Sequence, residues 1–132
     1  MLSKFSSRLL VVALLAGGGT LAAHHSTTAV FDTSKKVTVT GTLTKVDWVN
    51  PHIVVFIDAK GGSEMWKLES NPPSWFRRVN VGRTDFAKGI GQMVTVEANP
   101  AKDGTLYGYM TKMTFADKTS LELVLPGRED GK

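Results

Sequence analysis

Histidines are the side chains with which this chain could do metal chemistry. The sequence contains three of them, His24, His25 and His52. A free terminal amine, the next amide nitrogens and an imidazole form a nearly planar set of nitrogen donors that suits Cu(II) or Ni(II). Cleavage after Ala22 or after Ala23 would create such a set, because a histidine would then stand third or first in the mature chain. The histidine pair therefore predicts a copper site at a processed N-terminus.

The third histidine allows a sharper hypothesis, in which all three side chains share one Cu(II). His24 would bind through its amine and imidazole, His25 would add nitrogen, and His52 would complete the site from across the fold. Asp32 or Asn50 would then hold a ring nitrogen from outside the ligand set. The simpler alternatives are a frayed, solvated end and a turn histidine whose ring bonds to a backbone carbonyl. These hypotheses differ in whether the imidazole rings of the three histidines lie close together.

The N-terminal segment has the layout of a secretory signal peptide. Lys4 and Arg8 supply positive charge, an apolar run covers residues 9–16, and glycines followed by small residues come after it. The run is shorter than the roughly 20 apolar residues that a membrane span needs. We therefore expect residues 1–23 to be removed, and residues 24–132 to form a single domain in the periplasm without a membrane attachment.

Composition limits the classes of function. The chain has 132 residues, of which 42% are hydrophobic, which is enough for one packed domain. It has no cysteine, which excludes disulfides, zinc–cysteine sites and thiol catalysis. The net charge is +4, and removal of Lys4 and Arg8 with the leader leaves +2. Basic residues do not cluster with aromatic ones, so we expect no nucleic-acid partner.

The stretch before His52 predicts a bent strand. Over residues 37–44, apolar residues and glycine alternate with threonines, which is the period of a half-buried strand. The apolar parity changes after Lys45, so we expect a bulge near Thr44 or a bend at Gly41. Proline in the following Asn-Pro pair predicts a turn, which places His52 at the head of the next strand.

The remaining pattern predicts an all-β fold with one short helix. Residues 53–57 are apolar on both parities, as in a strand covered on both faces. The short helix is expected at about residues 72–79, with Asn71 as its cap, and a further helical turn is allowed near Asp85. The other expected strands cover residues 64–69, 93–98, 107–115 and 121–125.

This order is typical of an OB-like barrel of five to six strands, closed or partly open, with a helix plugging one end. A plain sandwich is the alternative that periodicity leaves open. In the expected strands Tyr107, Tyr109 and Met113 share one face. Trp48 is expected mainly in the core, and Glu69 points outward or towards a groove.

Several motifs together resemble a family of small secreted bacterial proteins catalogued as a domain of unknown function. The resemblance spans nearly the whole mature chain and implies an exported β-barrel without an established activity. It also implies a double histidine directly after the cleavage site, which favours His24 as the first mature residue. The chain departs from the family at Gln92, where an acidic residue is usual, and at residues 79–82. The motifs are His24-His25-Ser26, Phe31-Asp32, Gly41-Thr42 with Trp48, Asn50-Pro51-His52, Trp66 and Pro100-Ala101-Lys102-Asp103-Gly104.

This pattern indicates three functions, which we rank from the most to the least favoured. The first is an exported, non-enzymatic binding protein that holds copper through His24, His25 and His52. The second is a metal-independent periplasmic module that binds a solute or a protein through the Trp48 strand face, Glu69 and the loop at residues 99–104. The third is a copper-dependent oxidoreductase, which ranks last because no acid–base pair or nucleophile is visible.

Overall fold

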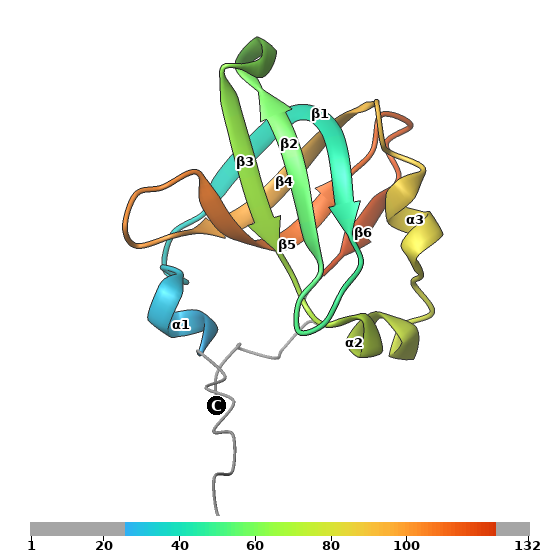
Figure 1. Cartoon of the computed structure of the whole chain (residues 1–132), viewed down its shortest axis with the longest axis horizontal. Coiled ribbons are helices and arrows are strands. Elements are labelled where there is room, and N and C mark those ends of the chain that lie inside the picture. The colour runs from blue at the N-terminus through green and yellow to red at the C-terminus, as the bar shows by residue number, and fades with distance from the viewer. Residues whose placement is uncertain (1–25, 124–132) are drawn as a thin grey trace, which may run out of the picture.

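The computed structural model describes residues 26–123, and these form a β-barrel with short helices at its ends (Figure 1). The sheet has the strand order β3-β2-β1-β4-β5-β6, and β3 also pairs with β5. No helix within the described residues is long and apolar enough to cross a membrane. The strands are β1 (Val37–Asp47), β2 (Val54–Ala59), β3 (Glu64–Glu69), β4 (Met93–Pro100), β5 (Tyr107–Thr114) and β6 (Ser120–Glu122).

Strand β1 is long enough to pair with two neighbours because it bends. Its first half pairs with β4 and its second half pairs with β2. The register with β2 shifts between Leu43 and Lys45, so Thr44 forms the predicted bulge. At Gly41 the strands lie so close that a Cβ atom would be 2.2 Å from the carbonyl oxygen of Asp58. Glycine therefore permits the bend that turns the sheet towards closure.

The parallel pairing of β3 with β5 closes the barrel. In this seam Lys67 lies opposite Tyr107, and Glu69 lies opposite Tyr109. Five strands make the closed barrel, and β6 extends the sheet along the far end of β5. The predicted fold class, an all-β barrel of the OB type, is confirmed. A sandwich would have left β3 and β5 as separate edges.

Helices α2 (Pro73–Arg78) and α3 (Arg83–Ala87) follow β3 and cover one end of the barrel core. Phe76 and Phe86 are fully buried with ring centroids 5.4 Å apart, and Trp48 lies 5.6 Å from each of them. This aromatic cluster confirms that Trp48 packs against the core. The structure also adds α1 (Thr27–Val30) and a 3-10 turn, η1 (Lys60–Gly62), to the single helix that the sequence predicts.

Two expectations about strand faces were wrong. Strand β2 buries Val55 and Ile57, whereas Phe56 on its other face stays partly exposed, because no layer covers that side of the barrel. In β5 the register shifts beside Thr111, so Met113 faces the barrel core while Tyr109 does not. A bulge reverses the parity of a strand, so one alternation cannot describe both halves.

The segment before β1, residues 26–32, is called here the arm. It contains α1 and then Phe31, which forms an isolated antiparallel bridge with Ala101. Phe31, Ala101 and Tyr109 form a second buried cluster, and Val30 and Tyr107 pack against it. The arm is therefore docked on the outside of the barrel, beside the start of β5.

Candidate functional site

The backbone around β3 fixes the orientation of the His52 ring. His52 Nδ1 lies 2.8 Å from the carbonyl oxygen of Ser70, which is the contact that the simpler alternative, a turn histidine bonded to a backbone carbonyl, also predicts. Since a carbonyl only accepts, this bond requires the proton on Nδ1 and leaves the lone pair of Nε2 free. Ser70 is itself held, because its amide donates to the carbonyl of Ile53 over 2.9 Å. The side chain of His52 is 31% exposed, so its ring is ordered yet accessible.

Glu69 lies between His52 and the start of β5. Its Oε1 is 4.0 Å from His52 Nδ1, and its Oε2 accepts the hydroxyl proton of Tyr107. Burial makes the largest contribution to raising the pKa of Tyr107. The hydrogen bond to Glu69 and the negative charge of Glu69 raise this pKa further. The phenol is thus kept protonated, and the carboxylate is held where it faces the imidazole of His52.

Asn71 was expected to cap a helix, and that expectation was wrong. Pro72 occupies the cap position of α2, without a side-chain cap bond. Asn71 instead accepts a 2.8 Å hydrogen bond from the Tyr109 hydroxyl and donates one of 2.8 Å to the carbonyl of Leu123. It therefore links the end of β3 to β5 and to the residue that follows β6, instead of capping the helix.

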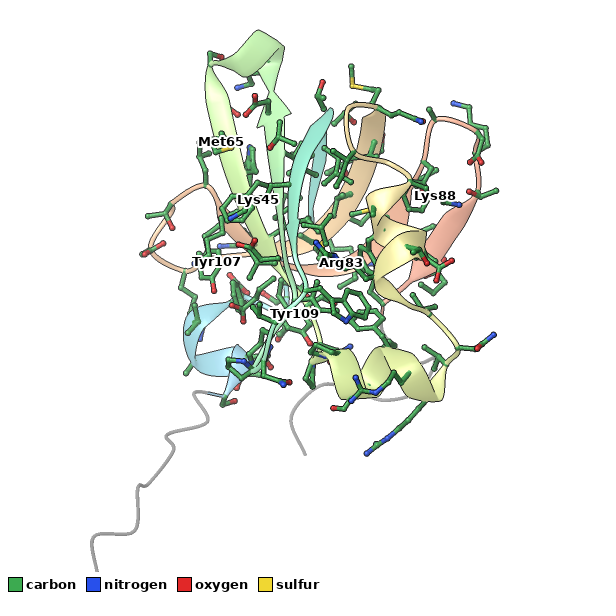
Figure 2. All side chains as sticks on the ribbon, turned by 45° about the vertical axis from the view of Figure 1, so that its right-hand side comes forward. Lys45, Met65, Arg83, Lys88, Tyr107 and Tyr109 are labelled. Atoms are coloured by element: carbon green, nitrogen blue, oxygen red, sulfur yellow. The ribbon has the colours of Figure 1, made fainter. Side chains whose placement is uncertain are left out.

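The arm packs on the same two tyrosines. The ring of Phe31 lies 5.0 Å from that of Tyr107 and 5.7 Å from that of Tyr109. In Figure 1 and in Figure 2, which labels both tyrosines, α1 and the loop between β1 and β2 lie at the same end of the barrel. His52 belongs to that loop. Helix α1 of the arm and the loop that carries His52 therefore lie at the same end of the barrel.

Asp32 and Asn50, which the sequence predicts to hold a ring nitrogen, do not hold that of His52. Asp32 closes its own turn, accepting from the amide of Ser34 at 3.1 Å and its hydroxyl at 2.6 Å, with Lys35 at 3.1 Å. These contacts, led by the Ser34 hydroxyl, lower the pKa of Asp32. Asn50 is exposed and precedes a cis peptide bond. Ser70, rather than Asp32 or Asn50, therefore holds Nδ1 of His52.

His24 and His25 lie outside the described residues. Within residues 26–123 there is no group of three or more His, Cys, Asp or Glu side chains that could hold a metal ion. The described part supplies one imidazole, with the Glu69 carboxylate beside it. A copper site at His52 would therefore need further donors from outside residues 26–123.

Tyr107 and Ser70 take part in this site although neither was singled out from the sequence. The sequence places Tyr107 only on a strand face, and its contact with Glu69 arises from the parallel pairing of β3 with β5. Ser70 contributes a backbone carbonyl, for which side-chain types give no signal. For these two residues only the pairing of the strands reveals the role.

A family model described as "Family of unknown function (DUF6152)" matches residues 12–111. That match includes the arm, His52 and the whole β3–β5 seam. No curated protein and no solved structure matches the chain significantly.

Proposed function

We propose, from the premise that the chain belongs to the DUF6152 family of unknown function, that it is an exported, non-enzymatic Cu(II)-binding protein. Its ligands are the amine and imidazole of His24, nitrogen from His25, and Nε2 of His52. Export to the periplasm and cleavage of residues 1–23 create the free amine of His24. The metal is bound at the end of the barrel where the arm begins.

The observation that carries this proposal is the ring orientation and the tautomer of His52. A ligand histidine usually donates its other ring N–H to a carbonyl or a carboxylate, which fixes the tautomer and the ring orientation. His52 has this arrangement, with Ser70 O at 2.8 Å from Nδ1 and a Glu69 oxygen at 4.0 Å. Its free Nε2 is a good donor for Cu(II).

The position of the arm supports the remaining ligands. Only His24 and His25 separate the expected mature start from Ser26, and two residues span at most about 7 Å. A shared site therefore needs an arm that begins at the His52 end of the barrel. Packing of Phe31 on Tyr107, whose hydroxyl bonds to Glu69 next to His52, supports such a position for the arm.

The test is Cu(II) titration of the protein exported with its own leader, against a competing chelator. The mature mass identifies the cleavage site. We expect one Cu(II) per chain, and a loss of affinity of about tenfold or more in His52→Ala, because one ligand is removed. A cytoplasmic version that keeps an additional N-terminal Met should also bind weakly, because its amine is displaced.

Val49→Ala is the matched control, since it truncates an exposed side chain in the same loop. Its Cu(II) affinity should equal that of the wild type. Equal affinity in His52→Ala and wild type would overturn the shared site, and failure of the mature protein to bind Cu(II) would overturn the copper function.

A metal-independent binding module remains the second candidate, and one surface favours it. Basic and aromatic residues alternate in register across four adjacent strands on the outer barrel face, contrary to the expectation from the sequence that the two kinds do not cluster. The residues are Lys45, Phe56, Lys67 and Tyr107. Lys45 Nζ lies 5.2 Å from the Phe56 ring centroid, and Lys67 Nζ lies 5.1 Å from that of Tyr107. Binding of a solute or a protein that persists in the presence of a metal chelator, and that is lost in Phe56→Ala, would support this function.

A further inference from the structure

An open hollow of about 400 Å³ lies on the outer face of the barrel, where β1 passes the hairpin between β2 and β3. It is lined by residues 40–42 of β1, Asp58 of β2, residues 60–62 of η1 and Met93 of β4. The turn η1 lies at the end of the barrel opposite to α1 and to the loop that carries His52 (Figure 1). The hollow is therefore separate from the proposed copper site.

The strand register brings polar and apolar groups of the hollow into one row. Thr42 lies opposite Asp58 on β2 and opposite Met93 on β4. Burial alternates along β1 and β2, so Thr40, Thr42 and Asp58 point away from the barrel core. Thr40 Oγ1 lies 3.0 Å from Thr95 Oγ1 and keeps a lone pair for a further donor. The hollow thus offers hydroxyl and carboxylate oxygens beside the side chain of Met93, which is 56% exposed.

The carboxylate of Asp58 is the uncompensated charge of the hollow. Within residues 26–123 it makes no hydrogen bond and no ion pair. Lys60 also lines the hollow, but its Nζ lies 2.5 Å from Glu64 Oε1. The hydrogen bond from Lys60 lowers the pKa of Glu64 most, and one of 3.3 Å from Trp66 Nε1 lowers it further. Glu64 therefore stays ionised and holds the lysine, and the charge of Asp58 is left for a ligand.

The backbone of η1 fixes Lys60 on the Glu64 side and leaves the rim of the hollow low. Lys60, Gly61 and Gly62 have φ values of 49°, 70° and 90°, so three successive residues are left-handed. The hydroxyl of Ser63 donates to the carbonyl of Lys60 over 3.0 Å and closes the turn. At both glycines a Cβ atom would have no neighbour within 4 Å, so nothing described covers the opening.

We propose that the hollow binds an aliphatic primary amine. An ammonium group carries three N–H donors, and the Asp58 carboxylate and the hydroxyl oxygens of Thr40 and Thr42 are acceptors on one surface. The flexible side chain of Met93 packs against the alkyl chain of the ligand. An anion would be repelled by Asp58. Ca²⁺ takes about six to eight oxygen ligands, for which one carboxylate and two hydroxyls are too few.

The test titrates the metal-free protein with 1-aminopentane and follows the backbone amides by nuclear magnetic resonance. We expect saturable shifts at Thr42, Asp58 and Gly61, and binding at least about tenfold weaker for 1-pentanol, which has the same alkyl chain without the charge. Asp58→Asn keeps the shape of the side chain and should lose affinity for the amine by about tenfold or more. The fold should be retained, because the carboxylate has no partner within residues 26–123.

Asp47→Asn is the matched control. Asp47 also lies on β1–β2 outer surface, where it pairs with Lys45 at 2.9 Å, and it is not part of the hollow. Its replacement removes the same charge from the protein, so it reports general electrostatic attraction. The affinity of this variant for 1-aminopentane should equal that of the wild type.

A second pair of variants tests the role of Glu64. In Glu64→Gln the side chain of Lys60 loses its ionised partner and can turn to Asp58, so the amine should bind several-fold more weakly. Addition of Lys60→Met to Glu64→Gln removes this competitor and should restore the affinity. A merely structural role of Glu64 would not be reversed by the second substitution.

Equal affinity for 1-aminopentane in Asp58→Asn and wild type would overturn the proposal, as would equal losses in Asp58→Asn and Asp47→Asn. Absence of saturable shifts at the hollow in the wild type would also overturn it. Asp58→Asn should leave Cu(II) binding unchanged, since the hollow lies at the other end of the barrel. Failure of the copper function therefore leaves the amine site standing, and the reverse holds as well.

Discussion

The side chain of Glu69 contacts both Tyr107, in the strand pairing that closes the barrel, and His52. It stands at the end of β3, where one oxygen accepts from Tyr107 on β5 and the other faces His52. The hydrogen bond to Tyr107 joins the two strands that close the barrel. The same carboxylate therefore joins the strands that close the barrel and lies beside His52, whose ring is held by the Ser70 carbonyl.

The protonation state of Tyr107 gives a prediction for stability at high pH. A tyrosine in the unfolded chain ionises near its ordinary pKa of 10.0, and the folded pKa is raised by burial and by Glu69. The stabilisation is therefore complete below the unfolded pKa and is lost as the pH rises above it. We expect the stability difference between wild type and Tyr107→Phe to stay constant up to about pH 9 and to shrink as the pH rises above the unfolded pKa of 10.0.

Urea unfolding followed by tryptophan fluorescence at a series of pH values measures this difference. The pair is its own control, because all other titrating groups are shared. A difference that stays constant with pH would show that ionisation of Tyr107 does not couple to folding.

Among the elements, β1 has the largest influence on shape, since it pairs with both β2 and β4. Its bulge at Thr44 and its close approach at Gly41 let one strand serve both neighbours. The loop that follows β1 carries His52. The bend of this strand therefore fixes the direction from which His52 reaches the end of the barrel.

Gly41→Ala should be strongly destabilising, because the new methyl group would lie 2.2 Å from a backbone carbonyl oxygen that cannot rotate away. Overpacking of this kind costs about 3 kcal/mol. Gly82→Ala is the matched control, since its nearest neighbour would be a side-chain atom at 3.7 Å. Denaturant midpoints of the two variants should differ clearly, and equal midpoints would contradict the close approach.

At the scale of the whole fold, the described residues form two hydrophobic clusters of unequal size. The barrel core includes Phe76 and Phe86, and the smaller cluster contains Phe31, Ala101 and Tyr109. Only the smaller cluster holds the arm. The arm can therefore loosen without loss of the barrel core.

Phe31→Ala should release the arm and leave the barrel folded, whereas Phe86→Ala should destabilise the whole domain. A fully buried core phenylalanine costs about 3–5 kcal/mol when truncated, and a residue of a peripheral cluster costs less. Limited proteolysis with mass spectrometry should find early cuts near the arm only in Phe31→Ala. Equal losses of stability in the two variants would show that the arm and the barrel unfold as one unit.

Local patterns in the sequence determined the strands, the bulge in β1, the position of α2 and the general fold class. These features follow from side-chain periodicity and turn residues within a few positions. The sequence also singled out His52 and the motifs at residues 31–32 and 100–104. It could not say that the two motifs bind each other.

The tertiary structure decided which residues meet. Parallel pairing of β3 with β5 brings Glu69 to Tyr107, 38 residues away, and the docked arm brings Thr28 to Lys102, 74 residues away. A strand's alternation fixes only which face a side chain takes. The partner on that face depends on register, bulges and closure of the whole sheet, which no local pattern contains.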